Sequence, residues 1–185
     1  MKRTLLSVML AAVTLCACNT SGKKTDEAQK ADATETTTES QTEETTEAGD
    51  VTKAPDFTLD DINGNPLALS SLRGKYVVLD FWGSWCVWCI RGIPMMKEYY
   101  AKYPGKFEIL GIDCNDTDEL WKEAVKKHDL PWLHVYCPQE SSLLDDYGVK
   151  NFPTKIIIGP DGKIVKSIVG EDPSFYTFLD ELFDK

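Results

Sequence analysis

One segment constrains the fold of this chain more than any other, namely a cysteine pair placed between a strand and a helix. The run Tyr76 to Trp82 is almost continuously apolar, which is typical of a buried central strand. Cys86 and Cys89 follow it, and apolar residues then recur at helical spacing from Ile90 to Tyr100. The pattern predicts a Cys-x-x-Cys motif at a helix N-terminus, where free N–H groups and the helix dipole stabilise a thiolate.

This spacing favours a redox-active pair over other uses of two cysteines. Cys89 would lie one helical turn from Cys86, close enough to attack a mixed disulfide formed there. A zinc site requires two more ligands at metal-like spacing, and haem attachment requires a histidine where Ile90 stands. A structural disulfide is the remaining alternative, although so short a loop stabilises a fold little. We therefore expect no metal and no organic cofactor.

The first fifty residues predict a secretion signal and a tether. An uncharged apolar run from Leu5 to Leu15 follows a basic start and is too short to span a bilayer comfortably. Cys18, after the small Ala17, resembles the lipidated cysteine of a bacterial lipobox, so we expect residues 1–17 to be a lipoprotein signal peptide. An ordinary signal with incidental cysteines is the alternative. Residues 18–50 would be the lipidated cysteine and a disordered acidic Thr/Glu-rich tether, because 19–50 hold nine Thr and nine Asp or Glu but little apolar surface.

Residues 51–185 are expected to form one α/β domain. Further strands are predicted at 106–113, 133–137, 155–158 and 163–169, with helices at 117–128, 141–147 and from Phe175 onward. In the helix at 117–128, the side chains predicted to face the core are Leu120, Trp121, Ala124 and Val125. The formal net charge of −10 makes nucleic acid a poor partner, because an acidic chain repels phosphates.

Several motifs together resemble the thioredoxin superfamily, and more closely its envelope branch of TlpA/ResA-like (AhpC/TSA-redoxin related) thiol–disulfide oxidoreductases. The resemblance covers about residues 53–185. It rests on Trp85-Cys86-Val87-Trp88-Cys89, Pro94, Asn151-Phe152-Pro153-Thr154, Gly170 and the entry segment from Ala54 to Lys75. It implies a thioredoxin fold, that is, a central mixed sheet flanked by helices, with an N-terminal β-hairpin extension and a helix–strand insertion.

The resemblance also implies a role for each matching residue. Cys86 would be the attacking thiolate and Cys89 the resolving thiol, while Asp80 would move the proton of Cys89. Asp80 is a charge in an apolar strand, and desolvation should raise its pKa. The implied substrate-binding residues are Trp85, Trp88, Phe152 and Pro153, with Pro153 in the cis form. Relatives tied to cytochrome c maturation usually carry Glu where Gly92 stands, so the acid–base groups are expected to be arranged as in thioredoxin.

Two further cysteines, Cys114 and Cys137, end two of the predicted strands. If those strands are parallel neighbours, both cysteines lie at the sheet edge that carries the active site. In an oxidising compartment they could form a second disulfide, remain separate thiols, or exchange with Cys86–Cys89 as a second redox couple. His128 and His134 are isolated and are expected to be surface or packing residues.

These patterns predict a membrane-tethered thiol–disulfide oxidoreductase of the bacterial cell envelope, facing the periplasm and acting as a reductase. Its expected partners are protein disulfides, a membrane or thioredoxin-like redox partner that regenerates the dithiol, and the lipid bilayer. The alternatives are a disulfide oxidant or isomerase, a thiol peroxidase, and a non-enzymatic copper-binding lipoprotein. The peroxidase motif P-x-x-x-T-x-x-C is missing between Trp82 and Cys86, and the copper chaperones use the longer C-x-x-x-C spacing.

Overall fold

The central sheet is built around β3 (Tyr76–Trp82), the apolar strand expected from the sequence. In the computed structural model, which describes residues 52–184, the five strands are ordered β5-β4-β3-β6-β7. β3 pairs in parallel with β4 (Phe107–Cys114) and antiparallel with β6 (Thr154–Ile158). β5 (Leu133–Cys137) lies parallel to β4, and β7 (Ile164–Val169) forms a hairpin with β6. The mixed sheet and the inserted strand are as predicted.

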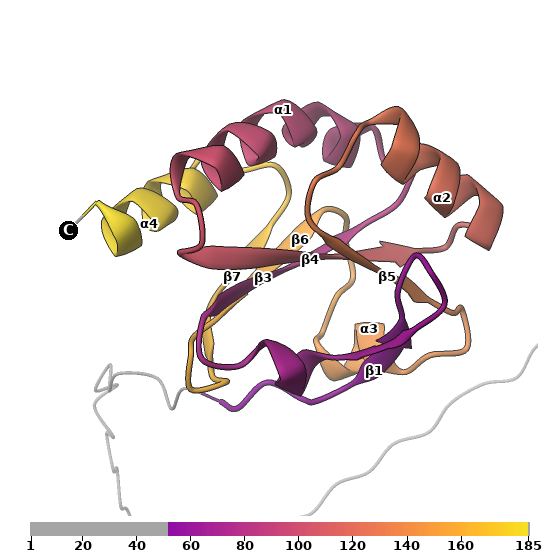
Figure 1. Ribbon diagram of the computed structural model, residues 1–185, viewed down its shortest axis with the longest axis horizontal. Helices are drawn as coiled ribbons and strands as arrows, with labels where there is room; N and C mark the ends of the chain where they lie inside the picture. Colours follow the sequence, from indigo (N-terminus) through magenta and orange to yellow (C-terminus); the bar gives the residue numbers. More distant parts are fainter. Residues whose placement is uncertain (1–51, 185) are drawn as a thin grey trace, which may run out of the picture. The chain divides into compact units, whose positions relative to one another are not determined.

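Helices and a small hairpin cover the two faces of this sheet (Figure 1). One face carries α1 (Val87–Lys102), α2 (Asp118–Lys127) and α4 (Ser174–Phe183). The other carries α3 (Leu143–Asp146), the 3-10 turn η1 (Leu69–Leu72) and the expected entry hairpin of β1 (Thr58–Asp60) and β2 (Pro66–Ala68). Within residues 52–184, no helix is long and apolar enough to cross a membrane.

Alternation along β3 separates two apolar cores and decides where its one charged residue points. Leu79 and Phe81 belong to a hairpin-side core, together with residues of η1 and α3. Val78 and Trp82 pack on the opposite side, against residues of α1, α2 and α4. Because side chains alternate between faces in a strand, Asp80 lies on the same face as Val78 and Trp82, under the helices.

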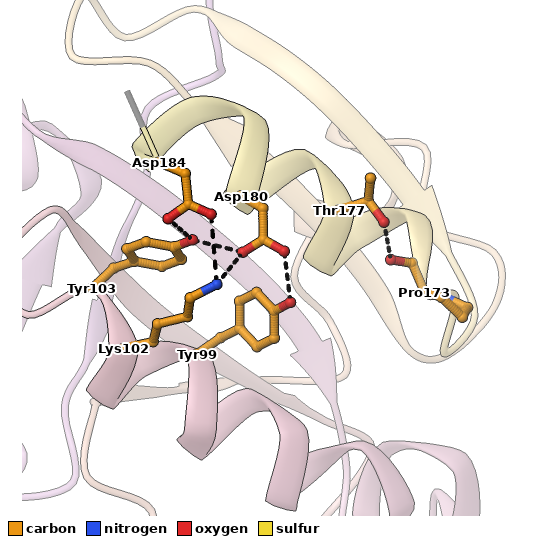
Figure 2. A network of polar contacts seen from close by, with 7 residues as sticks. All are labelled: Tyr99, Lys102, Tyr103, Pro173, Thr177, Asp180 and Asp184. Carbon is orange, nitrogen blue, oxygen red and sulfur yellow. Dashed lines mark hydrogen bonds and ion pairs between the residues drawn. The ribbon is translucent and has the colours of Figure 1, made fainter.

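A polar network holds α4 against α1 (Figure 2). Asp180 accepts hydrogen bonds from the Tyr99 hydroxyl at 2.9 Å and from Lys102 Nζ at 2.8 Å. Tyr103 Oη lies 2.6 Å from Asp180 Oδ1 and 2.8 Å from Asp184 Oδ1. The Lys102 ammonium and the tyrosine hydroxyls lower the pKa of Asp180 to about 2. The network therefore fixes the position of α4. A loop connects this helix to the end of β7.

One core prediction is wrong. Leu120 is 49% exposed, whereas Trp121, Ala124 and Val125 are buried. The three buried positions have the i, i+3, i+4 spacing of a single helical stripe, and Leu120 lies about 100° to its side. The predicted signal peptide, the lipidated Cys18 and the tether lie outside the described residues and stay predictions.

Candidate active site

Cys86 and Cys89 form a disulfide at the N-terminus of α1. Cys86 is the N-cap of the helix, and its Sγ accepts a hydrogen bond from the Cys89 N–H at 3.1 Å. Both cysteines are buried. In the reduced protein, the same free N–H groups and the helix dipole favour a thiolate at Cys86, which is the arrangement that the motif predicts.

Two tryptophans of the same motif are exposed, although the disulfide itself is buried. Trp85 is 48% exposed and Trp88 is 60% exposed. The Trp85 ring contacts Phe152 edge to face, with centroids 5.2 Å apart, and the peptide bond between Phe152 and Pro153 is cis, as the resemblance implies. Arg91 lies over the Trp88 ring at 4.8 Å. An exposed apolar surface of this kind is typical of a site that contacts another polypeptide.

The loop before the disulfide is anchored to the end of β4. The Trp85 indole N–H donates to the carbonyl of Cys114 at 2.9 Å, and Gly83 lies against this bond. A Cβ on Gly83 would lie 2.8 Å from the Cys114 carbonyl oxygen and closer still to Trp85 Nε1, so only glycine fits. The N–H and hydroxyl of Ser84 donate to the Asp116 carboxylate at 2.6 and 2.7 Å.

Asp80 is a buried acid, with 9% of its surface exposed. Its direct partner across the sheet is Lys155 of β6, which is only 2% exposed and places Nζ 3.9 Å from Asp80 Oδ1. Burial raises the pKa of Asp80, the Lys155 charge lowers it, and the Glu171 charge raises it. The direction agrees with the desolvation argument made from the sequence.

The sequence reasoning missed three polar residues that share this space, namely Lys155, Glu171 and Tyr176. Lys155 Nζ donates to Glu171 Oε2 at 2.8 Å, and the Tyr176 hydroxyl donates to Glu171 Oε1 at 2.6 Å. Lys155 carried a usable signal, because it is a charge in the apolar strand after Pro153, just as Asp80 is in β3. Glu171 follows Gly170 in a polar turn and carried no such signal.

Cys114 and Cys137 are free thiols on directly paired residues of β4 and β5. The predicted parallel neighbours are therefore confirmed, while the disulfide between them is not formed in this structure. Both side chains pack into the hairpin-side core, away from the cluster that holds Cys86 and Cys89. Contact with Cys137 and burial raise the pKa of the Cys114 thiol. The carbonyl of Cys114 contacts the active-site loop by accepting the hydrogen bond from Trp85.

A second buried acid lies beside the site. Asp113 pairs with Trp82 across β3 and β4 and is fully buried. Burial, followed by the nearby Asp116, raises the pKa of Asp113 to about 9. His134, packed between Trp82 and Trp132, is the buried packing histidine expected, and burial lowers its pKa to about 4.

Comparison with known proteins agrees with this geometry. The family model described as the AhpC/TSA family matches residues 51–167. The chain belongs to the AhpC/TSA family. Within that family, it is 38% identical to a thiol-disulfide oxidoreductase ResA of Bacillus cereus over 120 residues, which cover 64% of this chain and 69% of that protein.

Solved structures of similar proteins confirm the thioredoxin-like fold of this AhpC/TSA-family protein. The thioredoxin domain of a thiol-disulfide oxidoreductase from Bacteroides vulgatus matches with a TM-score of 0.67 and 28% identity, covering 74% of this chain and 99% of that one. A thiol-disulfide oxidoreductase from Bacteroides fragilis NCTC 9343 matches with a TM-score of 0.65 and 30% identity, covering 71% and 100%. The chain is thus a thioredoxin-like thiol–disulfide oxidoreductase related to ResA.

Proposed function

We propose that this protein is a reductase of protein disulfides, tethered by lipid to a membrane of the bacterial cell envelope. The observation that carries the proposal is the disulfide at the start of α1, which lies beside an aromatic rim and on the sheet face that holds the buried acid Asp80. The rim consists of the exposed Trp85 and Trp88 and the half-buried Phe152. The same disulfide would also serve a disulfide oxidant or isomerase, and the reduction potential of the pair distinguishes the two directions.

Reduction begins with an attack by the Cys86 thiolate on one sulfur of a substrate disulfide. A bond forms between Cys86 Sγ and that sulfur, the substrate S–S bond breaks, and the second substrate sulfur leaves as a thiolate. The substrate polypeptide lies on the aromatic rim, and an extended segment pairs with the backbone at Phe152, before Pro153. The large apolar face of Trp88 favours apolar substrate segments.

Cys89 completes the exchange. It passes its proton to Asp80 and attacks Cys86 Sγ, so the mixed disulfide breaks and the first substrate sulfur leaves as a thiolate. Two electrons have then moved from the cysteine pair to the substrate, and the Cys86–Cys89 disulfide remains. A membrane or thioredoxin-like dithiol donor reduces it again by the same exchange in the opposite direction.

The reduction potential of the pair tests the direction of electron flow. A value near that of thioredoxin, about −270 mV, supports a reductase. A value near that of DsbA, about −120 mV, would overturn that direction in favour of an oxidant or isomerase. Trapping tests the substrate class. We expect Cys89→Ser to accumulate mixed disulfides with envelope proteins and the matched variant Cys86→Ser to accumulate none.

Membrane fractionation tests the tether. We expect the wild-type chain in the membrane fraction and Cys18→Ala in the soluble fraction, because the lipid on Cys18 supplies the anchor. Mass spectrometry of the N-terminal peptide provides the second readout, namely a diacylglyceryl-type mass on Cys18. An unmodified N-terminus released at another residue would contradict the lipoprotein assignment and leave the oxidoreductase activity untouched.

A further inference from the structure

We infer that Glu171 is a positioning residue for the resolving step, because it holds the Lys155 ammonium and so controls when Asp80 accepts the proton of Cys89. The inference rests on the proton-accepting role proposed above for Asp80. It adds a carboxylate that comes from the loop between β7 and α4, far along the chain from the Cys-x-x-Cys motif.

The Glu171 carboxylate occupies the space that a side chain at position 92 would need. A Cβ added to Gly92 would lie 2.5 Å from Glu171 Cδ and closer still to its Oε2. Gly92 is a buried residue of α1, three positions after Cys89, so both lie on one face of the helix. The carboxylate therefore lies against the helix face that carries the resolving cysteine.

Glu171 and Asp80 compete for a single ammonium. Lys155 Nζ is 2.8 Å from Glu171 Oε2 and 3.9 Å from Asp80 Oδ1. The second oxygen of Glu171 is held by the Tyr176 hydroxyl at 2.6 Å. Asp80 Oδ1, by contrast, has no hydrogen-bond partner among residues 52–184. Charge interactions are strong in so buried a site, so the unequal sharing of Lys155 has a large effect on Asp80.

The charges that face Asp80 come from two directions. Lys155 approaches from β6 and favours the ionised form of Asp80, while Glu171 approaches from the loop before α4 and opposes it. Tyr176 of α4 acts through its bond to Glu171, and Cys89 of α1 is the group that loses the proton. Neutralising Glu171 removes a negative charge and leaves Lys155 free to pair with Asp80. Both effects act in the same direction, and the pKa of Asp80 must fall.

The decisive experiment is an NMR titration of the Asp80 carboxyl carbon in the purified, reduced full chain. We expect Glu171→Gln to lower the pKa of Asp80 by about one pH unit or more. Lys155→Met is the matched variant, which removes a positive charge instead of a negative one and should raise the pKa of Asp80. The spectrum of Asp80→Asn identifies the signal. An Asp80 pKa that is unchanged in Glu171→Gln overturns the inference, and the proposed reductase function stands.

Gly92 provides an independent route to the same displacement. Gly92→Ala must push the Glu171 carboxylate aside, so it should also lower the pKa of Asp80, although it changes no charge. In a Glu171→Ala background the added methyl group meets no carboxylate, and Gly92→Ala should then have little effect on either stability or the Asp80 pKa. A purely structural role for Glu171 predicts changes in melting temperature without any change in that pKa, and this result would overturn the inference.

Kinetics separates this inference from the function on which it rests. In the resolving step, a disulfide-containing peptide releases the sulfur that was held in the mixed disulfide with Cys86. The pH midpoint of this release should move with the Asp80 pKa in Glu171→Gln. If Asp80→Asn leaves the rate and pH dependence of that release unchanged, both the role of Asp80 and the inference are overturned. Reduction of insulin disulfides by the same preparation then shows independently whether the oxidoreductase activity itself is intact.

Discussion

Replacement of Gly83 by alanine tests how the active-site loop is held in place. The new Cβ would lie 2.8 Å from the carbonyl oxygen of Cys114 and closer still to Trp85 Nε1. The carbonyl belongs to the buried end of β4 and cannot move away, so the loop itself must shift. The shift breaks the hydrogen bond from the Trp85 indole to Cys114.

The cost can be worked out from these two contacts. Overpacking against a fixed atom costs about 1–3 kcal/mol. The lost hydrogen bond adds about 1 kcal/mol. Alanine restricts the unfolded chain more than glycine does, and this offsets about 0.4–1 kcal/mol. We therefore expect Gly83→Ala to lower the free energy of unfolding by about 2 kcal/mol.

Urea denaturation of the oxidised chain measures this loss. An unchanged slope of the unfolding free energy against urea concentration shows that the unfolded state is the same. Trp85→Phe is the control, because it removes the indole donor without a steric clash and should cost about 1 kcal/mol. In the Trp85→Phe background, Gly83→Ala should cost less than in the wild type but more than zero, since the contact with Cys114 remains. A loss below about 0.5 kcal/mol for Gly83→Ala alone would refute the reasoning.

Three further predictions concern residues around the site. Asp113 has its pKa raised to about 9 in the folded state, so between about pH 4 and pH 9 the native protein binds a proton that the unfolded chain releases. Wild-type stability should therefore fall relative to Asp113→Asn by about 1.4 kcal/mol per pH unit across that range, as measured by denaturation at several pH values, and parallel curves would contradict it. Trp88→Ala should raise the KM for a protein disulfide about tenfold, with little loss of stability, because the ring is exposed. Replacing both Cys114 and Cys137 with Ala should leave the potential of the active-site disulfide within about 10 mV, and a larger change would show that the two thiol pairs are coupled.

The sequence was informative wherever the determining pattern is local. The apolar run of β3 and the helical spacing after it placed Cys86 and Cys89 at a helix N-terminus, where the structure has them. Asp80 stood out because a charge in a central strand must be buried. The sequence did not predict the exposure of Leu120. A leucine next to an apolar stripe has the same neighbours in sequence whether or not it packs against the sheet.

By itself, the sequence determined the redox motif, its place between a strand and a helix, and the buried acid, because periodicity and helix termini depend on neighbouring residues. Only the tertiary structure decided what surrounds that acid. Glu171 reaches the helix of Cys89 because Gly92 leaves room for it and Lys155 attracts it. The packing of a distant loop against a helix depends on the shape and charge of both segments. The local sequence pattern of either segment does not show which other segment it contacts.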